Sequence, residues 1–108
     1  MTASRLDQLL SFENETPNDP FIIYGIALEY LNSAPDKAQV YFKKLLEEHS
    51  HYLPTYYKAA QFAESQNRFE EALELYEKGI ALATQQGDQH AKAELSTALG
   101  FLKEDLED

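Results

Sequence analysis

Residues 54–80 read PTYYKAAQFAESQNRFEEALELYEKGI and predict two helices joined by a very short turn. In each half of this stretch, apolar and small side chains recur at intervals of three and four, which places them on one helical face. They are Tyr56, Ala59, Ala60 and Ala63 within residues 54–66, and Ala72, Tyr76, Gly79 and Ile80 within residues 69–84. Asn67 lies between the helices, where a tight turn favours a residue that tolerates left-handed backbone. Helices joined by so short a connection pack antiparallel.

The preceding part of the chain repeats this arrangement. Residues 20–32 and 35–49 predict a second helix pair, with Pro20 well suited to a first helical turn. Matched residues are 33 apart in the first helices and 34 apart in the second, because the earlier turn is one residue shorter. The matched pairs are Tyr24 and Tyr57, Ala27 and Ala60, Ala38 and Ala72, and Phe42 and Tyr76. Self-similarity at a fixed interval predicts two tandem helix-turn-helix units, residues 20–49 and 53–84.

One further helix is expected on each side of the two units. Residues 4–12 carry leucines on one face, and Ser4 with Asp7 is a weak variant of a capping pair. Residues 88–106 begin with Asp88 as the expected cap and predict a helix that covers the exposed end of the stack. The residues expected to be buried there are Ala91, Leu95, Ala98, Leu99 and Leu102. The predicted fold class is all-α, an α-solenoid of tandem antiparallel helix pairs in a single domain, residues 1–108.

Composition and charge exclude several classes of function. The formal net charge of -10 and the pI of about 4.6 argue against binding nucleic acid, because its phosphates require a basic face. The chain has no cysteine, which excludes disulfides, thiol catalysis and thiolate metal sites. No segment approaches the roughly 20 apolar residues of a membrane span, and the N-terminal residues do not form a leader. We therefore expect a cytoplasmic protein that contacts neither nucleic acid nor membrane.

The two units resemble the tetratricopeptide repeat, a helix pair with a bulky residue, Leu-Gly and Tyr in its first helix and Ala and Phe in its second. Unit one reads Ile23, Ile26, Ala27, Tyr30, Ala38 and Phe42, and unit two reads Tyr56, Ala59, Ala60, Ala63, Ala72 and Tyr76. The opening Trp of the pattern is replaced in both units, and Ser50 and Thr84 stand where a closing Pro is common. The resemblance extends to small stand-alone bacterial repeat proteins.

The resemblance implies a protein that binds a peptide or a partner helix in a groove lined by the first helix of each pair. Carried over by position, the groove residues are Tyr24, Leu28 and Leu31 in unit one, and Tyr57, Lys58, Gln61 and Glu64 in unit two. Tyr24 and Tyr57 recur one repeat apart, and tyrosine offers a large contact area with a polar end. They form either a paired aromatic platform or half-buried packing residues. A groove for C-terminal carboxylates is disfavoured because Tyr24 and Leu28 occupy positions where it needs basic or amide side chains.

The sequence offers no catalytic, metal-binding or cofactor-binding motif, and we expect no enzyme activity. His49 and His51 stand beside Glu48, but histidines two residues apart on a helix point to different sides. The alternative to a binding module is a structural protein that associates with itself as a homodimer, because two units are fewer than the three usually needed for stability. Phe101, which lies off the main apolar face of its helix, is the candidate contact for that association.

Overall fold

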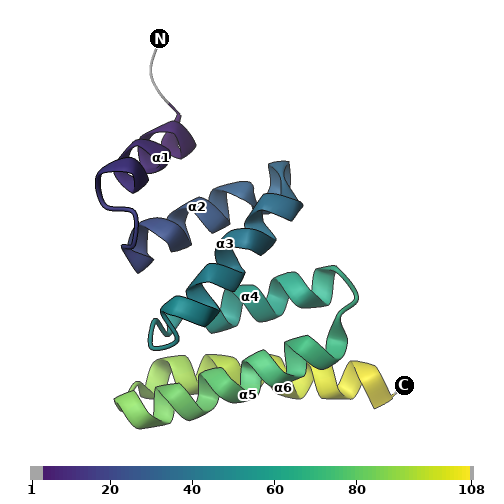
Figure 1. Ribbon diagram of the computed structural model, residues 1–108. Coiled ribbons are helices and arrows are strands. Elements are labelled where there is room, and N and C mark those ends of the chain that lie inside the picture. The colour runs from purple at the N-terminus through teal and green to yellow at the C-terminus, as the bar shows by residue number, and fades with distance from the viewer. Residues whose placement is uncertain (1–3, 108) are drawn as a thin grey trace. The chain divides into compact units, whose positions relative to one another are not determined.

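The computed structural model describes residues 4–107, and within that range it contains α-helices and no strand. The helices, which Figure 1 labels, are α1 (Arg5–Glu15), α2 (Pro20–Ser33), α3 (Pro35–Glu48), α4 (Pro54–Ser65), α5 (Phe69–Gln86) and α6 (Gln89–Glu107). The all-α fold of helix pairs is therefore confirmed. The helices form two compact units, the first ending at Tyr52 and the second beginning at Leu53. The single domain of residues 1–108 stays a prediction, and its residues 1–3 and 108 lie outside the described range.

Side-chain caps fix the starts of the two flanking helices. The backbone N–H of Asp7 donates to the hydroxyl of Ser4 over 3.0 Å, and the carboxylate of Asp7 accepts from the N–H of Ser4 over 3.4 Å. Asp88 accepts a hydrogen bond from the N–H of Ala91 over 3.0 Å at the start of α6. Each cap satisfies N–H groups that have no partner within the helix, so both predicted caps are confirmed. α1 ends at Glu15, three residues beyond its predicted end.

The turns use residues that fit their backbone conformations. Asn67 has a φ of 62°, which confirms the predicted left-handed turn between α4 and α5. Gly87, with a φ of 73°, ends α5 in the same conformation, where glycine has no steric cost. α5 continues to Gln86, two residues beyond the predicted end. Between α2 and α3, Ala34 alone ends one helix and begins the next, so the chain reverses within one residue.

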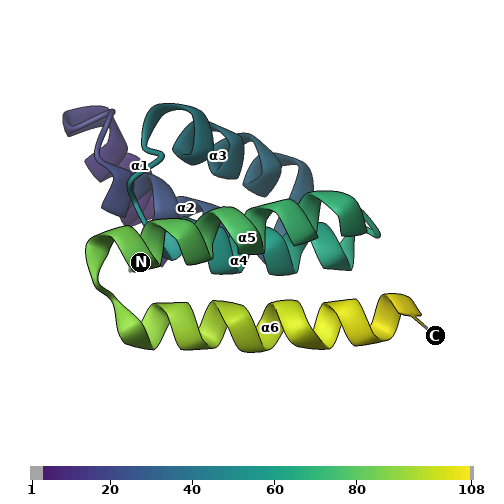
Figure 2. The same cartoon turned by 90° about the horizontal axis from the view of Figure 1, so that it is seen from below.

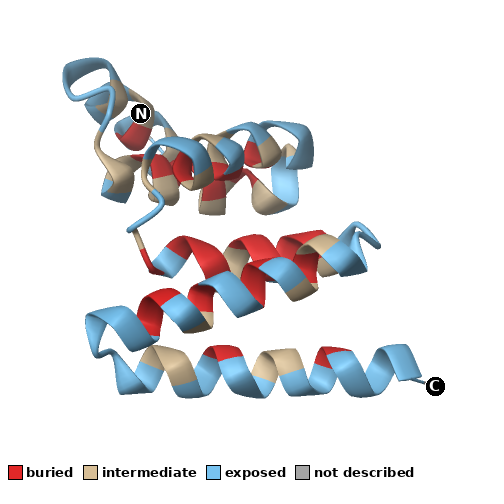
Figure 3. Ribbon diagram, turned by 60° about the horizontal axis from the view of Figure 1, so that its bottom comes forward, coloured by how far each residue is buried: buried red, intermediate tan, exposed pale blue. Residues whose placement is uncertain are grey.

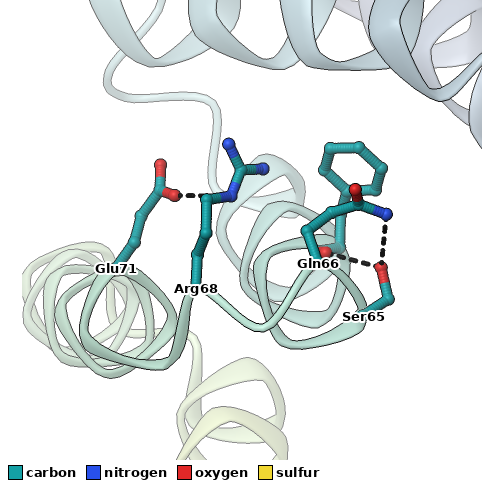
Figure 4. A network of polar contacts seen from close by, with 5 residues as sticks. Ser65, Gln66, Arg68 and Glu71 are labelled. Carbon is teal, nitrogen blue, oxygen red and sulfur yellow. Dashed lines mark hydrogen bonds and ion pairs between the residues drawn. The ribbon is translucent and has the colours of Figure 1, made fainter.

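Polar contacts hold the turn between α4 and α5 from both sides (Figure 4). At the end of α4, the hydroxyl of Ser65 donates to the carbonyl of Phe62 over 2.6 Å and accepts from the side-chain amide of Gln66 over 3.5 Å. The guanidinium of Arg68 lies 5.6 Å from the centre of the Phe62 ring, and its Nε pairs with Glu71 over 3.2 Å. Arg68 thus connects the end of α4 to the first turn of α5.

In the first unit, α2 packs against α3 on one side and α1 on the other (Figure 1). Leu9 of α1 is buried and lies against Gly25 of α2, where the missing side chain gives it room. Glu29 of α2 pairs with Arg5 of α1 over 3.0 Å. The buried core of α2 and α3 consists of Ile23, Ile26, Ala27, Tyr30, Ala38, Phe42 and Leu45. These include all the unit-one residues that match the repeat pattern.

In the second unit, α5 is the middle helix, with α4 on one side and α6 on the other (Figure 3). Figure 2 shows α6 lying alongside the α4–α5 pair. α4 and α5 bury residues along their length, whereas α6 is mostly exposed (Figure 3). The predicted burial of Leu95 and Leu102 is confirmed. The other three residues expected in the core of α6, Ala91, Ala98 and Leu99, are only partly buried. α6 therefore meets α5 along a narrow line of contact and leaves the rest of its surface open to water.

Gly79 of α5 lies where the three helices of the second unit come closest. A Cβ atom at this position would stand 2.8 Å from the Cβ of Tyr56 on α4, and 3.1 Å from Cδ1 of Leu95 on α6. A carbon contact of 2.8 Å is far inside the optimal separation of about 3.5 to 4.0 Å. The Cβ of Tyr56 cannot move without the backbone of α4. Any side chain at position 79 therefore forces α4 and α5 apart.

We expect Gly79→Ala to lower the free energy of unfolding by about 1 to 3 kcal/mol, the usual cost of overpacking a core. Gly100→Ala is the matched control, because a Cβ at Gly100 of α6 meets nothing within 4 Å. That variant should raise the free energy of unfolding by roughly 0.5 to 1 kcal/mol through helix propensity alone. Urea unfolding followed by circular dichroism measures both. Equal effects of the two substitutions would contradict the close packing at Gly79.

Candidate functional site

An open groove of about 480 Å³ lies between α4 and α6 in the second unit. α4 forms one wall, α6 forms the other, and Tyr76 of α5 lies between them. We call this feature the α4–α6 groove. Its lining residues are Tyr57, Gln61 and Glu64 from α4, Tyr76 from α5, and His90, Ala93, Glu94, Thr97, Ala98 and Phe101 from α6. The groove is apolar along much of its length and carries carboxylates on both walls.

Of the groove residues expected in unit two, Tyr57, Gln61 and Glu64 line the α4–α6 groove. They follow one another at intervals of four and three residues, so they lie along one face of α4. Lys58 does not line the groove, because one residue along a helix turns the side chain through about 100°. The structure thus brings three of these four residues together. Their role in binding stays a prediction.

The aromatic and acidic side chains at the base of the groove contact one another. The hydroxyl of Tyr76 donates a hydrogen bond of 2.5 Å to Oε2 of Glu64. The ring of Tyr57 meets the ring of Tyr76 edge to face, with the centroids 6.3 Å apart and the planes at 74°. This T-shaped arrangement is one that aromatic pairs prefer. Glu64 and Tyr57 are therefore held in fixed orientations by a single residue of α5.

Burial and the hydrogen bond to Glu64 raise the pKa of the Tyr76 hydroxyl well above the ordinary value of tyrosine. A similar pair exists in the first unit, where the hydroxyl of Tyr41 donates to Oε1 of Glu13 over 2.9 Å. Burial and that hydrogen bond raise the pKa of Tyr41 to about 12. Both hydroxyls therefore stay protonated near neutral pH and act as neutral donors to a carboxylate.

α6 supplies a wall of the groove, although the sequence pattern predicts it only as a cap. Phe101 lines the groove with 64% of its surface exposed. Earlier on the same face of α6, Nε2 of His90 lies against the carboxylate of Glu94, and both side chains are exposed. A signal for this wall is present in the sequence, since Phe101 lies off the apolar face that packs on α5. From that signal the sequence predicts Phe101 as a contact for self-association. It does not predict the other α6 residues that line the groove.

The predicted groove residues of unit one lie on α2 and are all partly buried. The ring of Tyr24 lies 5.7 Å from the ring of Tyr52, at an interplanar angle of 60°. Burial raises the pKa of the Tyr24 hydroxyl, and the neighbouring Tyr52 adds to that effect. Tyr24 thus has an aromatic partner within its own unit. Because Tyr57 belongs to the other unit, the paired platform of Tyr24 and Tyr57 stays a prediction, as do Leu28 and Leu31.

A second, smaller hollow of about 340 Å³ surrounds the loop after α3 and includes His49, His51 and Glu48. Nε2 of His49 lies 2.9 Å from Oδ1 of Asn18, so this histidine ties the loop to the turn before α2. Within residues 4–107, no three His, Asp or Glu side chains are grouped as ligands for a metal ion. No helix in the same range is long and apolar enough to cross a membrane.

Comparison with known proteins identifies the repeat. The family model for the tetratricopeptide repeat matches residues 30–99. The chain belongs to the tetratricopeptide-repeat (TPR) family. A tetratricopeptide repeat domain protein from Salinibacter ruber has a solved structure that is 32% identical, with a TM-score of 0.76 over 80% of this chain and 88% of that chain. A protein from Bordetella parapertussis, 18% identical, shares the fold at a TM-score of 0.81, covering 96% of this chain and 91% of that one.

No curated protein matches this TPR chain significantly. TPR units generally serve as protein-interaction modules, and proteins of the family are typically non-catalytic scaffolds. The general class of function is therefore protein interaction.

The raised tyrosine pKa values predict a loss of stability at alkaline pH. Unfolded tyrosine ionises near pH ~10, and a hydroxyl whose pKa is higher in the folded state stabilises that state fully below this value. The stabilisation is lost as the pH rises through the folded pKa. We therefore expect the free energy of unfolding to fall between about pH 10 and pH 12, with a shallower fall in Tyr41→Phe and in Tyr76→Phe.

Urea unfolding across that pH range measures the fall, and tyrosinate absorbance of the folded wild type, compared with that of each variant, checks whether Tyr41 and Tyr76 ionise late. Circular dichroism at neutral pH confirms that the variants are folded. An unchanged pH dependence in both variants would refute the assignment of raised pKa values to Tyr41 and Tyr76.

Proposed function

We propose that this TPR protein is a non-catalytic interaction module that binds a peptide or a partner helix in the α4–α6 groove. The observation that carries the proposal is the position of Phe101. Its side chain is 64% exposed although it lines a groove whose other wall includes the aromatic Tyr57. A large apolar side chain that is held open to water inside a groove is typical of an interaction site.

The dimensions of the groove fit a short segment of chain. On α4 the lining residues extend from Tyr57 to Glu64, which is about 10 Å at 1.5 Å per residue. On α6 they extend from His90 to Phe101, or about 16 Å by the same rise. Two turns of a helix, or three to five extended residues at roughly 3.3 Å each, span this length. The arrangement supports recognition of a helix or strand laid between two helices.

The walls are suited to contacts of several kinds. Tyr57 and Phe101 offer aromatic surface, and Ala93 and Ala98 leave room for the side chains of a partner. Gln61 and Thr97 offer both hydrogen-bond donors and acceptors. Aromatic anchors surrounded by polar groups are the usual composition of a site that carries much of the binding energy.

A second copy of the chain is the other candidate occupant. Phe101 of α6 is 64% exposed, so an α6 to α6 contact would bury it. This possibility keeps the homodimer as the alternative function. Sedimentation equilibrium at high micromolar concentration distinguishes the two, because a peptide-binding module stays monomeric and a self-associating protein does not.

We expect Phe101→Ser to weaken peptide binding about five- to tenfold, the loss that truncation of an interface anchor usually causes. The probe is the tightest synthetic peptide selected from a displayed library of random short peptides on the wild-type protein. Phe21→Ser is the matched control, because Phe21 is 66% exposed but lies on α2, outside the groove. Fluorescence anisotropy gives the affinities, and circular dichroism checks folding.

The proposal fails if Phe101→Ser binds the peptide as tightly as the wild type does. It also fails if no peptide is selected and sedimentation shows a dimer that Phe101→Ser dissociates. In that case a second copy of the chain is the occupant of this surface.

A further inference from the structure

We infer that the partner segment of the α4–α6 groove is both cationic and apolar, with Lys or Arg side chains that reach Glu64 and Glu94 and an apolar side chain that packs on Phe101. The inference rests on the proposed function and specifies the chemistry of its ligand. It follows from the charges that line the groove, from the side chains that hold them, and from the apolar surface beside them.

The ionisable side chains that line the groove are the acidic Glu64 and Glu94, together with His90, Tyr57 and Tyr76. Glu64 lies on one wall and Glu94 on the other, and none of the lining residues is Lys or Arg. The rest of the second unit adds to this field, because residues 53–108 contain eleven acidic and five basic side chains. An acidic groove in an acidic protein attracts a cationic segment and repels an anionic one.

Glu64 is held in place by a donor that brings no opposite charge. Its contact in the groove is the hydroxyl of Tyr76, so the hydrogen bond orients the carboxylate without pairing it with a cation. A carboxylate accepts up to about four hydrogen bonds, and most of that capacity is left for a ligand. A Lys or Arg side chain that reaches Glu64 therefore meets a carboxylate that is already oriented.

Glu94 has a partner that a ligand displaces at little cost. It pairs with His90 one turn before it on α6, and the two side chains are 51% and 87% exposed. An exposed pair of this kind contributes only about 0 to 1 kcal/mol. An Arg or Lys side chain of the ligand, which is fully charged at neutral pH, is the stronger partner for Glu94.

Two acidic residues of α5 have a different environment. Glu71 pairs with Arg68 over 3.2 Å (Figure 4), and Glu74 pairs with Lys78 over 2.8 Å. These two carboxylates are matched by basic residues of the chain itself. The two groove carboxylates instead contact a tyrosine and a histidine and lie on opposite walls of one groove, so a single cationic segment can reach both.

The apolar part of the ligand follows from the surface beside the carboxylates. Glu94 and Phe101 are seven residues apart on α6, and Glu64 and Tyr57 are seven apart on α4, so each wall places a carboxylate about two helical turns from an aromatic ring. α4 and α6 run in the same direction, since each is antiparallel to α5 (Figure 1), so the carboxylate of one wall lies toward the aromatic ring of the other, and a segment in the groove meets both kinds of surface along its length. Neither a purely basic nor a purely apolar segment satisfies both walls.

The test uses the displayed library of random short peptides and two charge-neutralising variants. Glu64→Gln/Glu94→Gln removes both groove charges, and the amide that replaces the Glu64 carboxylate keeps an oxygen that accepts from Tyr76. The control, Glu74→Gln/Glu77→Gln, removes the same charge from the exposed face of α5. We expect the selected peptides to be enriched in Lys or Arg together with aliphatic or aromatic residues. The tightest of them should bind the groove variant roughly three- to tenfold more weakly, as the loss of two exposed ion pairs implies.

Binding to the control variant should equal that of the wild type, and affinity should fall as salt is added. The inference of a cationic ligand is wrong if the selected peptides lack basic residues. It is also wrong if they bind Glu64→Gln/Glu94→Gln as tightly as the wild type. If the Phe101→Ser variant still binds the same peptides more weakly than the wild type does, the proposed groove function stands. If they bind both variants as tightly as the wild type, the groove function fails as well.

Discussion

The close approach of three helices at Gly79 is the constraint on which the second unit depends. Because position 79 has no side chain, the backbone of α5 lies directly against Tyr56 of α4, and the side chain of Leu95 from α6 fills the same space. This one contact sets the distance of both outer helices from α5. The α4–α6 groove is the space that the two outer helices leave between them, so its width follows from a packing contact that faces away from any ligand.

The helix pairs and most of their core were predictable, because burial in a repeat follows the period of small and bulky residues. Ala38, Phe42, Ala72 and Tyr76 were matched from their spacing alone, and all four are buried. α6 was harder to predict, since it has no matching repeat to indicate its second face. Spacing identified the line of contact through Leu95 and Leu102, whereas the groove wall depends on how α6 is rotated against α5, which sequence periodicity does not specify.

The polar contacts between helices that are joined by a turn could not be predicted from the sequence. Glu64 and Tyr76 are 12 residues apart, and only the folded antiparallel pair brings the carboxylate to the hydroxyl. The repeat pattern treats Tyr76 as a bulky core residue, equivalent to Phe42 of the first unit, which has no hydroxyl. The two units therefore share a core pattern and differ in polar chemistry. In the first unit Tyr41, one residue before the core position, forms the comparable hydrogen bond to Glu13.

A groove built from rigid helix faces limits the conformational entropy that is lost on binding. Tyr57 and Glu64 are already held by Tyr76, so a ligand that meets them does not have to order them. Phe101 and Glu94, by contrast, are exposed and lose rotamer freedom when a partner covers them. The two walls thus contribute differently, with α4 supplying preorganised contacts and α6 supplying apolar area. In the proposed complex, repulsion by the carboxylates on both walls provides selectivity against acidic segments, whichever wall provides more of the affinity.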